Sequence, residues 1–314
     1  MRRSAVLCCV LFAVSALGQI EFTYYPDELD RLRQRAEQGD AASQLKLAQA
    51  LSEGKGVQRD ESAAAFWMRK AADRGDPVAQ TLLGCMYAQG RGVEHDDDQA
   101  FKWFLRAAAF GDAVAQYNLG IMFLTGSGTH PDPKAALDWF NRAARQKYAP
   151  AFAGLGQLYL HGRGIERDDK IAFKMYLKAA EKGVLSAQEN IAWMLSNGRG
   201  VERNVPEALK WNLKAAAAGS RTAENNIGYI YEHGGPGLTP NYDESVRWYR
   251  KAADHGLAAA EYNLSILYRD GRGVPQDLQE SFRLSKLAAQ HGFPSPLPSP
   301  DDSSVQTASA KGTP

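Results

Sequence analysis

The chain of 314 residues has only three cysteines, and two of them, Cys8 and Cys9, lie in an apolar run near the N-terminus. Without that run Cys85 is the single cysteine left, so no disulfide can form within one chain. We therefore expect packing alone to stabilise the fold. Cys85 lies in a predicted helix beside a column of leucines, which predicts a buried, unreactive thiol.

The sequence also lacks an excess of charge of either sign. It has 37 Lys and Arg residues against 36 Asp and Glu residues, and without Arg2 and Arg3 the balance is 35 against 36, or about −1. A protein that binds nucleic acid or an anionic membrane usually carries a basic excess. We expect a partner of neither kind.

No apolar run is long enough to span a bilayer as a helix. The run Ala5–Leu17 has about 13 residues, where a spanning helix needs roughly 20. Arg2 and Arg3 precede the run, and Gly18 follows Ala16 and Leu17, so residues 1–18 are predicted to be a secretory signal peptide that is cleaved before Gln19. We expect a periplasmic or secreted protein; a retained membrane anchor is the alternative.

What the sequence does contain is a repeat of about 36 residues. The residues that begin successive repeats are Gly39, Gly75, Gly111, Lys147, Gly183, Gly219 and Gly256, and Gly292 follows the last repeat. The seven predicted repeats are residues 39–74, 75–110, 111–146, 147–182, 183–218, 219–255 and 256–292. A leading segment (19–38), with a capping helix over 27–38, comes before them, and a Pro- and Ser-rich tail (293–314), predicted to be disordered, comes after. This period predicts a right-handed α-solenoid, whose extended concave surface suits binding better than catalysis.

Each repeat is predicted to be a hairpin of two helices, A and B. In the repeat 75–110, apolar residues recur at helical spacing on both sides of a corner that contains Gly90 and Gly92. Helix B opens in every repeat with Asp or Asn, whose side chain satisfies the free amides of a helix N-terminus. These capping residues are Asp60, Asp96, Asp132, Asp168, Asn204, Asn241 and Asp277.

Three further columns describe packing. Helix B carries a tryptophan in five repeats, expected to fill the gap between repeats as core: Trp67, Trp103, Trp139, Trp211 and Trp248. Helix A carries an apolar column, namely Leu47, Leu83, Leu119, Leu155, Ile191, Ile227 and Leu264. A small residue follows each of these and lets helix B approach closely: Ala48, Gly84, Gly120, Gly156, Ala192, Gly228 and Ser265.

This pattern resembles the SEL-one-like repeat family, relatives of the tetratricopeptide repeats. The repeats 75–110 and 219–255 match its signature most fully, and the resemblance covers roughly residues 28–292. It implies an adaptor that assembles or regulates other proteins, or an immunity protein against a secreted toxin. A cysteine-rich subgroup is linked with penicillin binding and weak β-lactamase activity, but this chain lacks that subgroup's cysteine pairs.

No motif predicts catalysis, a cofactor or a metal. The repeated Gly-x-Gly joins two helices, whereas a dinucleotide fingerprint follows a strand. Ser43 and Lys46 have the spacing of a penicillin-interacting nucleophile motif, but its companion motifs are absent. The six histidines are spread across the chain, and His161 and His233, which share one repeat position, lie two repeats apart, beyond the reach of one metal ion. An enzyme of the cell-wall or β-lactamase type and an assembly factor for an envelope complex remain as alternative functions.

The variable positions of helix A are the candidate binding site. If the repeats stack as tetratricopeptide repeats do, the residues six and ten positions after each repeat's first residue face the concave side. The predicted partner-binding residues are Tyr117, Ile121, Trp193, Asn225, Tyr229, Glu232, Tyr262, Ile266 and Arg269, with Asp270 beside them. Tyr and Trp are favoured interface anchors. The alternative is that these aromatics pack between neighbouring A helices. We expect a monomer that binds a protein or peptide.

Two departures from the repeat stand out. Lys147 takes the place of a helix-closing glycine, which predicts either a strained left-handed corner or a different turn. The run Gly234–Gly237 gives the sixth repeat its extra residue.

Overall fold

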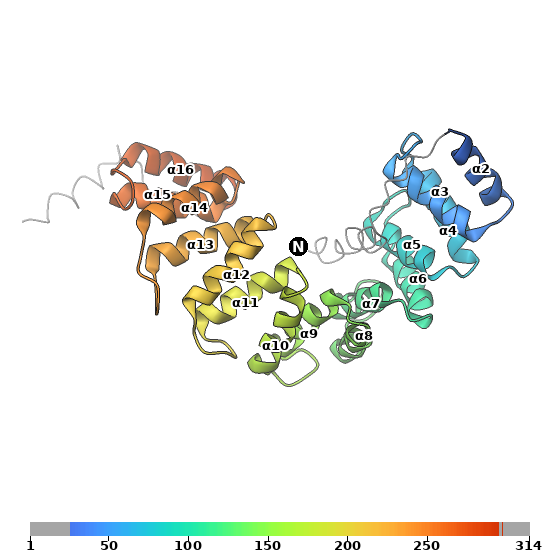
Figure 1. The fold of residues 1–314 in the computed structure, drawn as a ribbon, viewed down its shortest axis with the longest axis horizontal. Helices are drawn as coiled ribbons and strands as arrows, with labels where there is room; N and C mark the ends of the chain where they lie inside the picture. The colour runs from blue at the N-terminus through green and yellow to red at the C-terminus, as the bar shows by residue number, and fades with distance from the viewer. Residues whose placement is uncertain (1–25, 295–296, 298–314) are drawn as a thin grey trace, which may run out of the picture. The chain divides into compact units, whose positions relative to one another are not determined.

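The computed structural model describes residues 26–294 and 297, which form 15 α-helices and no β-strand (Figure 1). The predicted signal peptide and nearly all of the predicted tail lie outside these residues, so both stay predictions. The helices fall where the repeat predicts them, two to a repeat, after one leading helix. The all-α repeat fold is thus confirmed.

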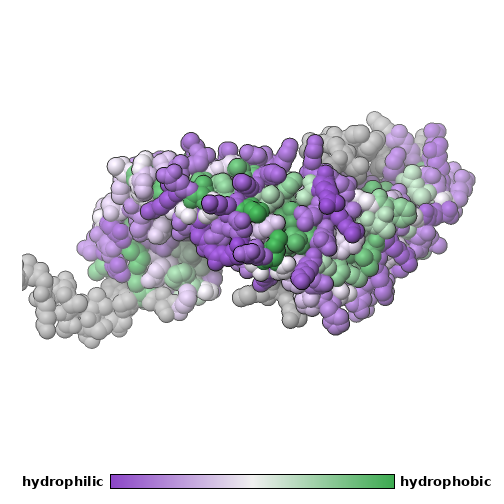
Figure 2. All heavy atoms as spheres, turned by 90° about the horizontal axis from the view of Figure 1, so that it is seen from below, coloured by the Kyte–Doolittle hydropathy of each residue, from purple (hydrophilic) through white to green (hydrophobic). Residues whose placement is uncertain are grey.

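The chain divides into two compact lobes between Asp168 and Asp169. The N-lobe contains α2 (Pro26–Glu37), α3 (Ala41–Glu53), α4 (Glu61–Asp73), α5 (Pro77–Gln89), α6 (Asp97–Ala109), α7 (Ala113–Thr125), α8 (Pro133–Arg145) and α9 (Ala149–His161). The C-lobe contains α10 (Asp169–Ala180), α11 (Leu185–Asn197), α12 (Val205–Ala217), α13 (Arg221–His233), α14 (Tyr242–Asp254), α15 (Ala258–Asp270) and α16 (Leu278–Gln290). Within each lobe every helix packs on the next one along the chain (Figure 1). Small apolar areas lie between hydrophilic side chains on the surface in Figure 2.

Helix B begins where the capping column predicts. The side chain of Asp96, for example, accepts a hydrogen bond from the Gln99 amide at 2.9 Å. The same cap is made by Asp60, Asp132, Asn204, Asn241 and Asp277. Helix A usually ends at a left-handed glycine, as at Gly90 with φ 66°, because glycine has no Cβ to clash there.

The leading helix α2 caps the N-lobe, as predicted. Leu29 and Leu32 are buried, and α2 packs against α3. The side-chain nitrogen of Gln44 donates to the carbonyl of Ala36 at 3.0 Å, which satisfies one of the free carbonyls at the end of α2.

The aromatic residue that packs on the small column is the one that follows the tryptophan position in helix B. A Cβ atom at Gly84 would lie 2.8 Å from the Phe104 ring, and one at Gly228 would lie 2.5 Å from the Tyr249 ring. Phe140 takes the same place in the third repeat. One residue along a helix turns the side chain by about 100°, so Phe104, Phe140 and Tyr249 point into the hairpin where the preceding tryptophans do not.

The tryptophans lie at the edge of the core. Trp103 and Trp211 are buried, whereas Trp67, Trp139 and Trp248 are only half-buried. A basic side chain three residues later covers the ring in four repeats: the charged group lies 4.4 Å from the ring centroid for Arg142 over Trp139, and 4.0 Å for Lys214 over Trp211. Trp103 and Trp211 thus belong to the core, and Trp67 and Trp139 pack against it. That these rings fill the gap between repeats stays a prediction.

The second glycine of the corner brings neighbouring repeats together. A Cβ at Gly200 would clash with the backbone carbonyl of Asp169, the first residue of α10. Arg199 beside it donates to the Asp169 carboxylate at 2.7 Å. In the N-lobe, Arg91 pairs with Glu61 at 2.8 Å in the same way. The glycine permits the close approach and the arginine adds an ion pair across the repeats.

Both departures from the repeat, at Lys147 and at Gly234–Gly237, are accommodated by turns of the backbone. Lys147 keeps the left-handed corner with φ 62° and is the only residue other than glycine with positive φ among those described. In the sixth repeat, Gly235 and Leu238 exchange two backbone hydrogen bonds at 2.8 and 2.9 Å, which folds the insertion into a tight turn.

Candidate functional site

The residues six positions after each repeat's first residue (the sixth-position column) contact the start of the next repeat. Thr81 donates to the Asp112 carboxylate at 3.0 Å, and Glu189 accepts from the hydroxyl of Ser220. Asp112 and Ser220 cap the next helix A. This column therefore locks one repeat to the next.

Three predicted partner-binding residues belong to this column. Tyr117 is only 8% exposed, and its ring centroid lies 5.6 Å from those of Phe140 and Tyr148. Tyr262 is half-buried and stacks on Phe293, with centroids 4.4 Å apart. Tyr117 is thus a packing residue, because the next repeat buries its ring, and Phe293 of the same chain covers one face of Tyr262.

Asn225, the third, is tied to its neighbour across the repeats. It accepts a hydrogen bond from the side-chain nitrogen of Asn263 at 3.0 Å. This bond joins α13 directly to α15 and shows that adjacent A helices of the C-lobe lie side by side. Asn225 is half-buried.

The residues ten positions after each repeat's first residue (the tenth-position column) include the exposed aromatics. Trp193 is 43% exposed and Tyr229 is 54% exposed, and α11 and α13 bring them to neighbouring repeats of the C-lobe. Ile121 in the N-lobe and Ile266 in the C-lobe are half-buried. Large exposed rings of this kind mark interaction surfaces more often than isolated aliphatic residues do.

Polar residues of α11 flank Trp193. Asn190 precedes it by three residues and Asn197 follows it by four, so the three share one face of the helix. The side-chain nitrogen of Asn190 donates to the carbonyl of Ser186 at 2.7 Å, and that of Asn197 donates to the carbonyl of Trp193 at 2.8 Å. The guanidinium carbon of Arg199 lies 5.3 Å from the centre of the Trp193 ring.

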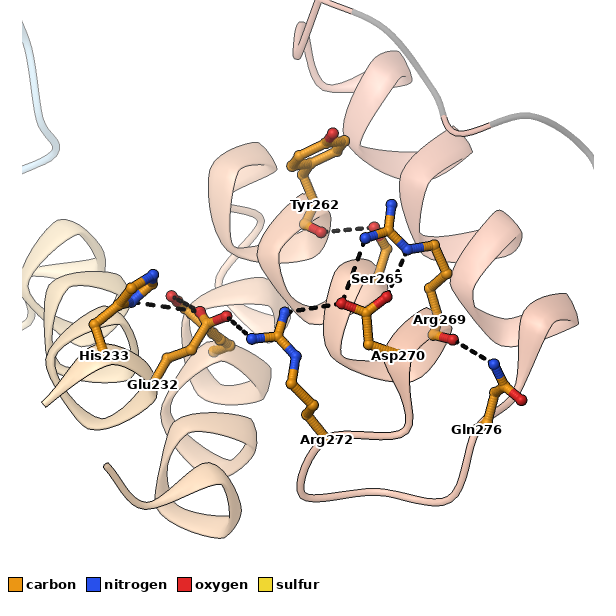
Figure 3. Close-up of polar contacts among 9 residues, drawn as sticks. Glu232, His233, Tyr262, Ser265, Arg269, Asp270, Arg272 and Gln276 are labelled. Carbon is orange, nitrogen blue, oxygen red and sulfur yellow. Dashed lines mark hydrogen bonds and ion pairs between the residues drawn. The ribbon is translucent and has the colours of Figure 1, made fainter. Parts of the chain in front are cut away.

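A charged network joins the ends of α13 and α15 (Figure 3). Glu232 accepts from the Tyr249 hydroxyl at 2.9 Å and from Arg272 at 3.0 Å. Arg272 also pairs with Asp270 at 3.0 Å, and Arg269 pairs with Asp270 at 2.7 Å. Both Glu232 and Arg269 are therefore engaged within the chain.

The network shifts two pKa values. Hydrogen bonding to Arg269 lowers the pKa of Asp270. Burial, aided by the nearby Glu232 carboxylate, raises the pKa of Tyr249 well above its usual range. Asp270 is therefore charged and the Tyr249 hydroxyl neutral at physiological pH.

The serine and lysine of the nucleophile-like motif have ordinary structural roles. Ser43 is buried, and both its amide and its hydroxyl donate to Asp40, the cap of α3. Lys46 is exposed. Within the described part of the chain no three His, Cys, Asp or Glu side chains are grouped so that they could hold a metal ion. Cys85 is buried and is not part of a disulfide.

Sequence reasoning missed the polar flank of the candidate surface. Asn190, Asn197 and His233 carry it, and the signal was present: asparagine three residues before and four residues after an exposed tryptophan lies on the same helix face. His233 lies four residues after Tyr229, and their rings stack with centroids 4.0 Å apart.

None of the helices described between residues 26 and 294 combines the length and apolarity that crossing a bilayer requires.

Tyr229 and Trp193, with their polar flank, are exposed on the A helices of the C-lobe. Partner binding by this surface stays a prediction.

Comparison with known proteins places the fold. The Sel1 repeat model matches residues 41–76, 77–112, 113–148, 150–184, 185–220, 222–257 and 258–293. No curated protein sequence matches the chain.

Solved structures give the same result. The chain is similar to c5321, a protective antigen present in uropathogenic Escherichia coli strains, with 29% identity and a TM-score of 0.68 over 84% of this chain and 64% of that one. It thus spans less than two thirds of that protein's length. It is also similar to a Sel1 repeat protein from Oxalobacter formigenes, with 29% identity and a TM-score of 0.66 over 93% of this chain and 83% of that one. Immunity protein Pa5087 from Pseudomonas aeruginosa, at 21% identity and a TM-score of 0.45 over 68% of this chain and 81% of that one, is too distant to bear on function.

The family model covers nearly all of the described helices, and its repeats differ from those beginning at Gly39 only in where each one is taken to start. The chain belongs to the Sel1 repeat family.

Proposed function

We propose that this protein is a non-enzymatic scaffold that binds another polypeptide on the exposed A-helix face of its C-lobe. The observation that carries the proposal is the exposure of Trp193 and Tyr229 on neighbouring A helices, while the rest of the repeated apolar columns are used for packing. Aromatic side chains of this kind bury a large area on binding at a low entropic cost.

Site-specific photocrosslinking in cells tests this function. A photoreactive amino acid is placed at Trp193 or Tyr229, and crosslinked products are identified by mass spectrometry. Gln157 is the matched control, because it occupies the same column in the N-lobe and is exposed. The proposal predicts one shared polypeptide at positions 193 and 229 and none at 157. Equal labelling at all three positions, or no crosslink at 193 and 229, overturns it.

We further propose that the chain acts outside the cytoplasm after cleavage behind Gly18. The supporting features are the paired arginines, the short apolar run and the small residues that follow it. The likeness to a protein described as a protective antigen is in keeping with export. N-terminal sequencing of the protein from fractionated cells should begin at Gln19, and a full-length cytoplasmic protein would refute export.

A regulator or immunity protein is the narrower form of this proposal. Such a protein would block a partner by covering the partner's active surface with the α11–α13 face, the exposed side of these two helices that carries Trp193 and Tyr229. Cells that produce the chain together with a toxin encoded beside it should survive, and cells that produce Trp193→Ala should not. Survival of neither population rejects the narrower form and leaves the scaffold function to the crosslinking test.

A further inference from the structure

The α11–α13 face, the exposed side of these helices that carries Trp193 and Tyr229, offers side-chain acceptors to a partner. Asn190 and Asn197 each bond through the side-chain nitrogen to a backbone carbonyl of α11, at 2.7 and 2.8 Å. A carbonyl oxygen can only accept, so the NH₂ group must be the one that faces it. The side-chain oxygens of both residues are therefore left for another donor.

His233 has the same polarity on α13. Its Nδ1 lies 3.0 Å from the carbonyl oxygen of Tyr229, so Nδ1 carries the hydrogen and the neutral ring offers Nε2 as an acceptor. Asn225 is the exception, because its oxygen is taken by Asn263 and its nitrogen remains.

The exposed rings add a second attraction for cations. Arg199 lies over the Trp193 ring while its guanidinium is bonded to Asp169. The ring thus already attracts one guanidinium, and the exposed 43% of Trp193 remains available to another. His233 stacks on one face of Tyr229, whose side chain is still 54% exposed.

The face supplies no free cation of its own to oppose such a partner. Apart from the histidine, α11 and α13 contain a single basic residue, Arg221 at the first position of α13, whose side chain donates to the carbonyl of His255 at 3.4 Å. The face therefore offers oxygen acceptors and aromatic rings, and the guanidinium of Arg199 that lies over Trp193 is already paired with Asp169.

We propose that the α11–α13 face recognises an arginine side chain on an extended segment of its polypeptide partner. The guanidinium stacks on Trp193 and donates a hydrogen bond to the side-chain oxygen of Asn197, while Asn190, about 10 Å away along α11, accepts from a neighbouring donor of the segment. Arginine fits better than lysine, since its planar group stacks on an indole and carries five donors in a fixed array. This inference rests on the proposed scaffold function and names the chemistry of its partner.

A peptide titration tests the inference. The probe is acetyl-Gly-Arg-Gly-Arg-Gly-amide, and its control replaces both arginines with citrulline, which keeps the shape and removes the charge. The chain has six tryptophans, so its ¹⁵N spectrum has six indole signals. We expect the arginine peptide to shift the Trp193 signal and to bind at least about tenfold more tightly than the citrulline peptide, a difference of about 1.4 kcal/mol.

Two variants distinguish arginine recognition from non-specific binding. Trp193→Ala should weaken binding of the arginine peptide at least about tenfold. Asn197→Asp keeps the outward acceptor and adds a negative charge, so it should tighten binding of the arginine peptide and leave the citrulline peptide unchanged. Thermal melts establish that both variants are folded. Equal affinity for the two peptides, or shifts of the Trp193 signal by a neutral oligosaccharide but not by the arginine peptide, overturns the inference.

Failure of this inference differs from failure of the scaffold function. If a polypeptide crosslinks at positions 193 and 229 in cells while the arginine peptide does not bind, the scaffold function stands and arginine recognition is wrong. If the arginine peptide binds but no polypeptide crosslinks, the face has the predicted chemistry and the scaffold function is wrong.

Discussion

The tenth-position column of helix A carries exposed aromatic rings in the C-lobe and none in the N-lobe, where its exposed residue is Gln157. In the N-lobe, Cys85 is only 2% exposed and Ile121 is half-buried, whereas Trp193 and Tyr229 occupy the equivalent positions of the C-lobe and are 43% and 54% exposed. Across the seven repeats the leucine column, the small column and the caps recur, whereas the tenth position varies from Cys85 to Trp193. We therefore expect the exposed aromatics of the C-lobe column to give the chain its own binding properties.

The largest expected effect contrasts a packing aromatic with an exposed one. Phe140→Ala empties the space against Gly120 and should lower the free energy of unfolding by about 3–5 kcal/mol. Trp193→Ala should change it by about 0.5 kcal/mol or less. Denaturant unfolding of both variants measures the contrast. Trp139→Ala should lower the free energy of unfolding less than Phe140→Ala does, because Trp139 is half-buried and Phe140 is buried. The reverse order would show that Trp139 contributes more to the core than Phe140.

The next effect contrasts two glycines of the C-lobe. Gly200→Ala forces a Cβ onto the backbone of α10, whereas a Cβ at Gly219 has nothing within 4 Å. Both positions have positive φ, at 68° and 89°, so backbone strain is common to the two variants. Gly200→Ala should lower stability by about 1–3 kcal/mol more than Gly219→Ala in the same unfolding assay. Equal losses would mean that the corner does not bring the repeats together.

Alkaline pH should weaken the C-lobe through a buried phenol. Burial raises the pKa of Tyr176 well above its usual range. The folded state therefore holds the phenol proton more tightly than the unfolded chain, whose tyrosine pKa is about 10. The stability that this phenol contributes is fully present below about pH 10 and is lost as the pH rises above that value. Tyr176→Phe should therefore recover about 1.4 kcal/mol relative to the natural chain between pH 8 and pH 11. Parallel stability curves for the two proteins over this range would show that the phenol is not buried.

The smallest effect tests the one departure from the closing glycine. Lys147→Gly should stabilise the N-lobe by about 0.5–1 kcal/mol, since it relieves a lysine held at φ 62°. Gly111→Lys is the matched reversal, because Gly111 has φ 89° and nothing within 4 Å of an added Cβ; its unfolding free energy should fall by a similar amount. A loss of stability in Lys147→Gly would mean that the lysine side chain has a role of its own.

Most of the fold could be predicted because its signals are local. A cap such as Asp96 acts on an amide three residues away, and a left-handed glycine such as Gly90 acts on its own corner. Consecutive helical residues point about 100° apart, so neighbouring aromatics of helix B lie in different surroundings. Periodicity alone could not show which of Trp139 and Phe140 points at Gly120.

The candidate site was less predictable because burial depends on the neighbouring repeat. Tyr117 and Trp193 look alike in the sequence, as aromatics at variable positions of helix A. The structure separates them, since Tyr148 from the next repeat packs on Tyr117, whereas Trp193 stays 43% exposed although Arg199 lies over its ring. The outward oxygens of Asn190 and Asn197 likewise follow from the direction of their hydrogen bonds, which composition does not reveal.

The most direct test of the C-lobe binding face is the double variant Trp193→Ala with Tyr229→Ala. Partner capture by crosslinking and the melting temperature are measured on the same preparation. We predict that capture is lost while the melting temperature falls by no more than about 2–4 °C. A large fall in melting temperature would assign both rings to the core, and undiminished capture in a stable variant would place the binding site elsewhere on the chain.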